Sequence, residues 1–179
     1  MSVVTSLSTP QRLVRVTRYA YGQLLLTSVH HAYGAYIYDS PWRLHVVAYS
    51  IVAAIVIGAA SAAHRKHETS VAGSIAFWVF CATTLAFPFG MIGFFEGAYN
   101  HVLKNVLYFG GVSPQLMQTM FPAPTYELPN NGVFEVTGMA QLVPAVVGIL
   151  HLFRLANGWR GLPRSESMTI GDPRQHSWK

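Results

Sequence analysis

The sequence of 179 residues has very little cysteine and little charge. Its one cysteine, Cys81, lies inside an apolar run, so the chain can form neither a disulfide framework nor a CxxC motif, and dithiol redox chemistry is excluded. Only 11% of the residues are charged, against about 25% in a typical soluble domain, and 51% are apolar. This composition predicts an integral membrane protein.

The chain is nevertheless basic, with 12 Lys and Arg residues against 7 Asp and Glu residues. The basic residues lie at the ends of apolar runs and do not gather in one patch. Nucleic-acid binding is therefore not expected, and membrane lipids are the expected partners.

Four apolar segments predict an all-α fold, an integral membrane four-helix bundle that forms a single domain over residues 1–160. The predicted spans cover about residues 13–38, 42–63, 71–104 and 134–155. The loop 110–133 is expected to contain a short helix from about Pro114 to Met120, and the polar, Gly- and Pro-rich tail 161–179 is expected to be disordered. A cleaved signal peptide is the alternative for the first segment, but its paired histidines and many tyrosines do not suit one.

Positive charge is distributed unevenly over the predicted loops. If all four segments span, the termini and the loop 64–68 hold ten of the twelve Lys and Arg residues, and the opposite side holds only Arg43 and Lys104. The positive-inside rule then places both termini in the cytoplasm, most simply of a bacterial inner membrane. The loop 110–133 would lie on the outer side.

This orientation brings polar side chains from all four predicted helices to one level near the outer face. Residues 71–95 carry no charge, and then Glu96 follows, which costs free energy to bury in lipid unless it has partners. Histidine and carboxylate groups from several helices are what a bundle uses to bind a transition metal. The predicted ligands are His31, His45, Glu96 and His101, with His30 and Glu135 as further candidates, and Asn100 and Tyr49 as supporting partners.

Regular α-helical geometry limits how these groups can combine. Adjacent His30 and His31 point about 100° apart, so only one of them is expected to share an ion with His45. Glu96 and His101 lie about 140° apart, so they reach one site only if the helix is locally distorted. The spacing is therefore less specific than that of an HExxH zinc helix.

The resulting hypothesis is an outer-facing site for iron, copper or zinc, with redox or hydrolytic chemistry on a small or lipophilic substrate. The sequence leaves open whether the chain is an enzyme. The alternatives are a plain hydrogen-bond network, a non-catalytic subunit in a larger membrane complex or a homo-oligomer, a proton-coupled transporter, and a single-haem protein.

The four-span size resembles that of vitamin K epoxide reductases, but those need a CxxC motif, which this chain lacks. It also resembles four-span haem b proteins, which place paired histidines on both sides of the bilayer. Here the inner side offers only His151 within a predicted span, so at most one outer haem would fit.

Overall fold

The computed structural model describes residues 8–123 and 125–159, and all regular structure in these ranges is helical. The predicted all-α class is therefore confirmed, whereas the predicted tail 161–179 lies outside the described residues. The elements are α1 (Thr9–Ile37), η1 (Pro41–Leu44), α2 (His45–Lys66), α3 (Val71–Thr84), η2 (Leu85–Leu103), α4 (Lys104–Phe109), α5 (Pro114–Met120), α6 (Gly132–Ala140) and α7 (Leu142–Gly158).

Helix starts follow local capping chemistry. Ser70 accepts a hydrogen bond from the backbone N–H of Gly73 at the start of α3, and Ser113 accepts one from Leu116 at the start of α5. Asn131 does the same for α6. Each cap satisfies a backbone donor that has no partner within its own helix. The predicted short helix Pro114–Met120 is confirmed with the same bounds.

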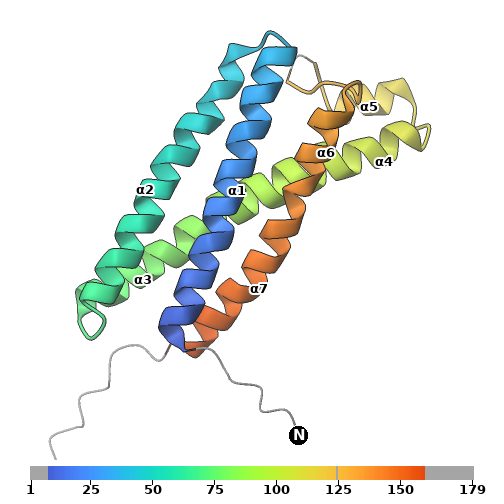
Figure 1. Cartoon of the computed structure of the whole chain (residues 1–179). Helices are drawn as coiled ribbons and strands as arrows, with labels where there is room; N and C mark the ends of the chain where they lie inside the picture. The colour runs from blue at the N-terminus through green and yellow to red at the C-terminus, as the bar shows by residue number, and fades with distance from the viewer. Residues whose placement is uncertain (1–7, 124, 160–179) are drawn as a thin grey trace, which may run out of the picture.

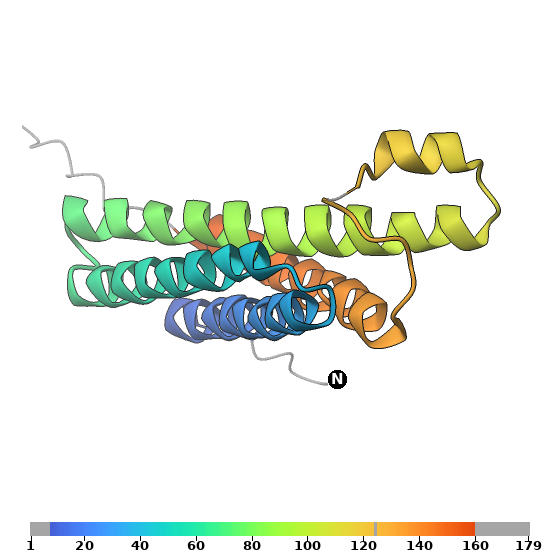
Figure 2. The same cartoon turned by 90° about the horizontal axis from the view of Figure 1, so that it is seen from above.

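The elements α3, η2 and α4 join into one uninterrupted helix from Val71 to Phe109, which forms one layer of the molecule (Figures 1 and 2). Its middle part, η2, is wound as a π-helix, in which each N–H bonds to the carbonyl five residues earlier. Pro88, which has no N–H to donate, lies in the first turn of η2. The site described below depends on this wider winding.

In Figure 2, α1 lies in the layer opposite the long helix. It packs against α2, α6 and α7, and it also contacts η2, the middle part of the long helix. The apolar core fills the half of the molecule that contains α3. It is built from the start of α1, the end of α2, α3 itself and the end of α7, with Phe77 and Phe80 fully buried. Most of the buried polar groups lie in the other half, around η2 and α6, whereas Ser61 and His64 of α2 are buried in the apolar half.

Three helices are long and apolar enough to cross a membrane: Pro41–Lys66, Val71–Phe109 and Gly132–Gly158. Large apolar side chains point outward from them, such as Ile55 with 65% of its surface exposed. The fourth predicted span, α1, does not reach the same apolar content, because it carries the buried polar side chains of Gln23, Thr27, His30 and His31. The structure therefore supports a membrane protein with three candidate spans.

The loop after α4 returns along the long helix. In Figure 2, α5 folds back beside the end of that helix. The Tyr99 hydroxyl of η2 donates a 3.0 Å hydrogen bond to the carbonyl of Met120. The Lys104 ammonium donates a 2.8 Å hydrogen bond to the carbonyl of Glu127. These bonds tie the loop to the polar half of the molecule.

Candidate metal centre

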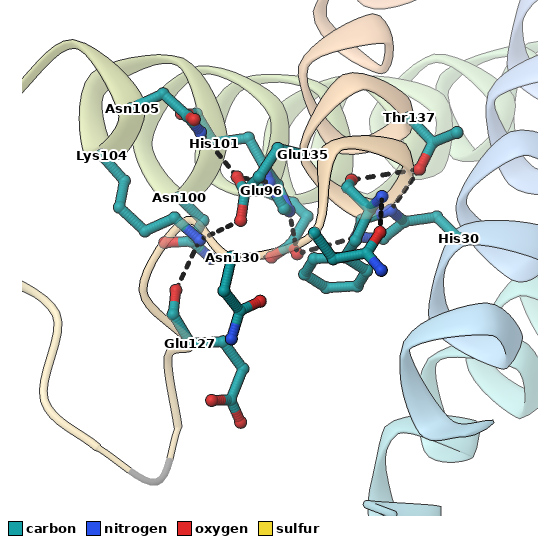
Figure 3. A network of polar contacts seen from close by, with 12 residues as sticks. His30, Glu96, Asn100, His101, Lys104, Asn105, Glu127, Asn130, Glu135 and Thr137 are labelled. Atoms are coloured by element: carbon teal, nitrogen blue, oxygen red, sulfur yellow. Dashed lines mark hydrogen bonds and ion pairs between the residues drawn. The ribbon is translucent and has the colours of Figure 1, made fainter. Parts of the chain in front are cut away.

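The polar half of the molecule is centred on Glu96, where three histidine rings approach one carboxylate oxygen. Figure 3 shows two of them, His30 and His101, beside Glu96. The Nε2 atom of His101 lies 3.4 Å from Glu96 Oε1, and those of His30 and His31 each lie 3.8 Å from the same oxygen. All three rings are buried. The structure thus brings together four of the six residues that the sequence predicted as ligands.

The π-helical winding of η2 is what allows Glu96 and His101 to face one site. In an α-helix these residues would point about 140° apart. In a π-helix the repeating hydrogen bond joins residues five apart, so residues at that spacing lie nearly above one another. The local distortion that the sequence required is therefore present.

The far side of each of two rings is held by a hydrogen bond. His101 Nδ1 lies 2.9 Å from Glu135 Oε2, and His30 Nδ1 lies 3.0 Å from the Thr137 hydroxyl. The Thr137 hydroxyl has the carbonyls of Val133 (2.8 Å) and Phe134 (3.1 Å) as acceptors for its one proton, and with the proton given to either it accepts from His30. We therefore assign a proton to Nδ1 of His30, and one to Nδ1 of His101 because a carboxylate only accepts.

This assignment leaves His30 Nε2 with a lone pair beside Glu96, and His101 Nε2 with one when that ring is neutral. His30 Nε2 is fully buried and makes no hydrogen bond. The other Glu96 oxygen, Oε2, accepts a 2.7 Å hydrogen bond from Asn100. If both rings are neutral, the Glu96 oxygen faces their lone pairs, which is unfavourable unless a cation lies between them.

Glu135 is the centre of a second, adjoining layer of contacts. Besides His101, it accepts a 2.9 Å bond from the buried Lys104 and a short bond from Asn105. Its oxygens are therefore used by donors from η2 and α4. Its place is behind His101, as an orienting partner of that ring.

Phe134 and two glycines fix the positions of the histidine rings. The Phe134 ring stacks on His30, with 4.2 Å between ring centres. A Cβ at Gly34 would overlap the Phe134 ring, and one at Gly138 would overlap the His101 ring. Close packing of this kind limits how far the rings can turn.

The geometry fits a single metal ion. Ligand atoms of His30, Glu96 and His101 all lie within 4.8 Å of one another. Nitrogen and oxygen donors bind metals such as zinc at about 2.0 to 2.2 Å, so donors around one ion lie roughly 3 to 3.5 Å apart. A small inward movement of the rings would suffice, with His31 at the same distance from Glu96 Oε1 as His30.

A pocket of about 370 Å³ reaches this group from the gap between α2 and η2. His31, Glu96 and His101 are among its polar lining residues, and the apolar side chains of both helices that line it include Val46, Phe87 and Met91. Tyr126 lies on the loop that borders the pocket, and burial, with a smaller contribution from the Glu96 carboxylate, raises the pKa of its hydroxyl. That hydroxyl therefore stays protonated.

Two predicted residues, His45 and Tyr49, lie on the pocket wall and outside the three-residue metal group. His45 Nδ1 is 2.5 Å from the carbonyl of Trp42, and the Tyr49 ring packs edge-on against the His45 ring. Asn100, predicted as a supporting partner, does bond the central carboxylate.

Lys104 and Asn105 were not among the site residues predicted from the sequence. In the structure both donate to Glu135. Thr137 was not singled out, and it holds His30. Thr137 lies two residues after Glu135 on α6. Its only sequence signal was a hydroxyl close to a predicted ligand near the start of that helix.

Comparisons with known protein families, with curated proteins and with solved structures found no match to this chain. Any functional conclusion therefore rests on the chemistry of the site itself.

Proposed function

We propose that this chain is a four-span membrane protein with both termini in the cytoplasm, and that it binds one transition-metal ion through His30, Glu96 and His101, with His31 as a fourth ligand. The proposed role is redox or hydrolytic chemistry on a lipophilic substrate in the outer half of the bilayer.

The contacts at both ends of α1 support the fourth span. At its start, Arg12 donates a 2.8 Å hydrogen bond to the carbonyl of Arg154 near the end of α7. Just past its end, the Tyr38 hydroxyl donates to Asn130, which precedes α6. The helices α6 and α7 together form a stretch, Gly132–Gly158, that is apolar enough to cross a membrane. Because α1 contacts both ends of this stretch, α1 would cross the membrane beside it.

One observation carries the metal proposal: the Nε2 atoms of His30 and His101 lie within 4 Å of the same Glu96 oxygen, while the Nδ1 atom of each ring is hydrogen-bonded on the far side. Metal-bound histidines commonly donate their other N–H to a carboxylate or another oxygen acceptor, as both rings do here. The rival is a protonated His101 that bridges Glu96 and Glu135. That arrangement would still leave His30 Nε2 buried and without a partner.

The donor set suits iron or zinc, and copper(II) as a further option, because only nitrogen and oxygen atoms surround Glu96 among the donors described. Two histidines and one carboxylate are typical of non-haem iron sites, and three histidines of catalytic zinc sites. Bound iron would supply redox chemistry, and bound zinc a Lewis acid. The chain would orient the ligands and keep bulk water away.

The proposal is tested by metal analysis of the purified full chain after loading with iron, zinc or copper and removal of excess ion. The wild-type protein is expected to retain about one ion per chain. Glu96→Gln and His101→Ala are each expected to weaken binding by at least about tenfold, since each removes one ligand from a small set.

His64→Ala is the matched control. His64 is also a buried helical histidine, but its Nδ1 lies 3.0 Å from the carbonyl of Gly73, at the opposite end of the molecule from the site. The His64→Ala substitution should therefore leave the metal content unchanged. A wild-type protein that retains no ion under any loading condition, or an equal loss in His64→Ala, would contradict the proposal.

A further inference from the structure

Arg43 is a buried cation at the edge of the pocket. Its sequence position, directly after Trp42 at the start of a predicted span, indicates an anchor at the membrane surface. In the structure only 5% of its surface is exposed and it lines the pocket that leads to Glu96. A buried guanidinium needs anionic or polar partners.

The protein holds Arg43 in place but uses only part of its donor capacity. Its Nε donates a 2.8 Å hydrogen bond to the Ser40 hydroxyl, and its guanidinium lies 5.0 Å from the centre of the Trp42 ring and 5.5 Å from that of Phe134. Its Nη2 is buried and makes no hydrogen bond. The nearest carboxylate, Glu127 Oε1, is 3.6 Å away, which is an ion-pair distance only.

Glu127 indicates which kind of group belongs beside Arg43. It comes from the loop before α6, and its side chain is about one-third exposed (32%), so it can turn away. Its carboxylate shows that such a group can approach the guanidinium from the pocket. Arginine binds planar carboxylates through two parallel N–H donors, and no bond of this kind is made to Glu127.

The charges around the pocket favour an anion once a metal is bound. The cations Arg43 and Lys104 face the carboxylates Glu96, Glu127 and Glu135, so negative charge exceeds positive by one. A divalent ion at Glu96 would reverse the sign and leave one positive charge uncompensated.

The pocket also has many apolar lining residues. Phe87, Met91 and Phe95 follow at four-residue spacing along η2 toward Glu96, and Val46 and Tyr49 of α2 line the facing wall. Met91, Phe95 and Tyr49 also expose about half of their surface. An apolar chain could therefore enter from the bilayer between these two helices.

We propose that the pocket binds a lipophilic carboxylate, a molecule with one apolar chain and a carboxylate head that pairs with Arg43 and replaces Glu127 there. The head would lie beside the Glu96 group, and the chain would follow Met91 and Phe87. Because this names the substrate class of the metal centre, it rests on the proposed function above.

The test uses the full chain in lipid nanodiscs and a brominated long-chain fatty acid, which quenches tryptophan fluorescence on contact. Trp42 lines the pocket and reports saturable binding. Trp78, which packs against Trp159 at the other end of the molecule, does not line it. Trp42→Phe should therefore remove the saturable part of the quenching.

Substitution of Arg43 and substitution of Glu127 are expected to shift the half-saturating fatty-acid concentration in opposite directions. Arg43→Gln should raise the half-saturating fatty-acid concentration about tenfold, since charge-assisted hydrogen bonds are lost. Glu127→Gln should lower it about two- to fivefold, since a competing carboxylate is removed. Lys66→Gln, an exposed cation at the far end of α2, is the control and should change nothing.

The head group is tested with the brominated alcohol and alkyl phosphate of the same chain length. The alcohol should bind the wild type about tenfold more weakly than the acid, and should bind Arg43→Gln as well as the acid does. Equal binding of acid and alcohol to the wild type, tighter binding of the phosphate, or an unshifted Glu127→Gln would overturn the proposal.

Failure of this inference and failure of the metal proposal are separable. Fatty-acid binding that depends on Arg43 in a protein that retains no metal would overturn only the metal centre. One retained ion per chain together with unchanged fatty-acid binding by Arg43→Gln would overturn only the pocket assignment.

Discussion

At the scale of single residues, Glu135 joins the histidine group to the charged side chains behind it. It holds His101 by a 2.9 Å contact and is also the ion-pair partner of Lys104, at 2.9 Å. Lys104 itself is only 2% exposed. One carboxylate therefore serves two purposes, compensating a buried cation and orienting a ring.

Glu135→Gln should show both losses. The buried Lys104 ammonium would lose its counter-charge, which costs about 3 to 5 kcal/mol of unfolding free energy. His101 would lose its charged acceptor, and metal affinity should fall about 10- to 100-fold. Thermal unfolding in detergent and metal titration measure the two effects separately.

The double variant Glu135→Gln with Lys104→Met distinguishes the two purposes. Removing the unpaired cation should restore much of the lost stability, because no uncompensated charge remains buried. Metal affinity should stay low. Recovery of both properties together would mean that Glu135 acts on the site only through stability.

At the scale of elements, the site depends on the close approach of α6 to η2. Gly138 of α6 lies against the His101 ring, and Gly97 of η2 lies against the backbone between α6 and α7. A side chain at either glycine would push the two elements apart. The π-helical winding of η2 and the glycines of both elements thus act together to place His101 beside Glu96.

Gly138→Ala should destabilise the protein by about 1 to 3 kcal/mol, since the added methyl overlaps the imidazole of His101. Metal retention should fall with it, because the ring must move. Gly132→Ala, in the first turn of the same helix, is the matched control, as a Cβ there meets nothing within 4 Å. Melting temperature and metal content of both variants check this, and equal behaviour of the two would contradict it.

The helices themselves were largely predictable from sequence, because uncharged runs and proline or serine starts determine where they begin and end. The predicted span 71–104 falls within one helix, which runs on to Phe109. The meeting of His30, His31, Glu96 and His101 followed from placing histidines and carboxylates at one level. Their roles as ligands stay a prediction.

The side-chain partners were not predictable in the same way. The π-helical winding arises over Leu85–Leu103 and leaves no periodicity that a single sequence displays. Asn105 reaches Glu135 and Arg43 lies over aromatic rings because of how α6 and the loop fold back on η2. Such contacts join residues about 30 to 90 positions apart, and a charge near a helix end looks the same in sequence whether it faces lipid headgroups or a pocket.

At the scale of the whole molecule, many large apolar side chains are exposed and many polar side chains are buried, unlike in a soluble bundle. Large apolar side chains face outward, including Leu25 of α1 with 68% of its surface exposed. Gln23, Thr27 and Gln141 are fully buried, and their side-chain atoms make no hydrogen bond. An apolar exterior with a polar interior is what a bilayer requires of helices that carry functional polar groups.

The proposed four-span topology makes a prediction that the chain's single cysteine makes easy to test. Cys81 is buried, and Cys81→Ala gives a cysteine-free background. Reporter cysteines at the exposed positions Glu68, Ala123 and Asn157 mark the α2–α3 loop, the long loop and the end of α7. A membrane-impermeant maleimide added to intact cells should label Ala123→Cys, and should label Glu68→Cys and Asn157→Cys only after the membrane is opened.

The reason for this expected labelling is the ten-to-two excess of Lys and Arg on the side that holds the termini and the loop 64–68. Labelling of Glu68→Cys and Ala123→Cys from the same side would rule out a span between them, and with it a metal centre in the outer half of the bilayer.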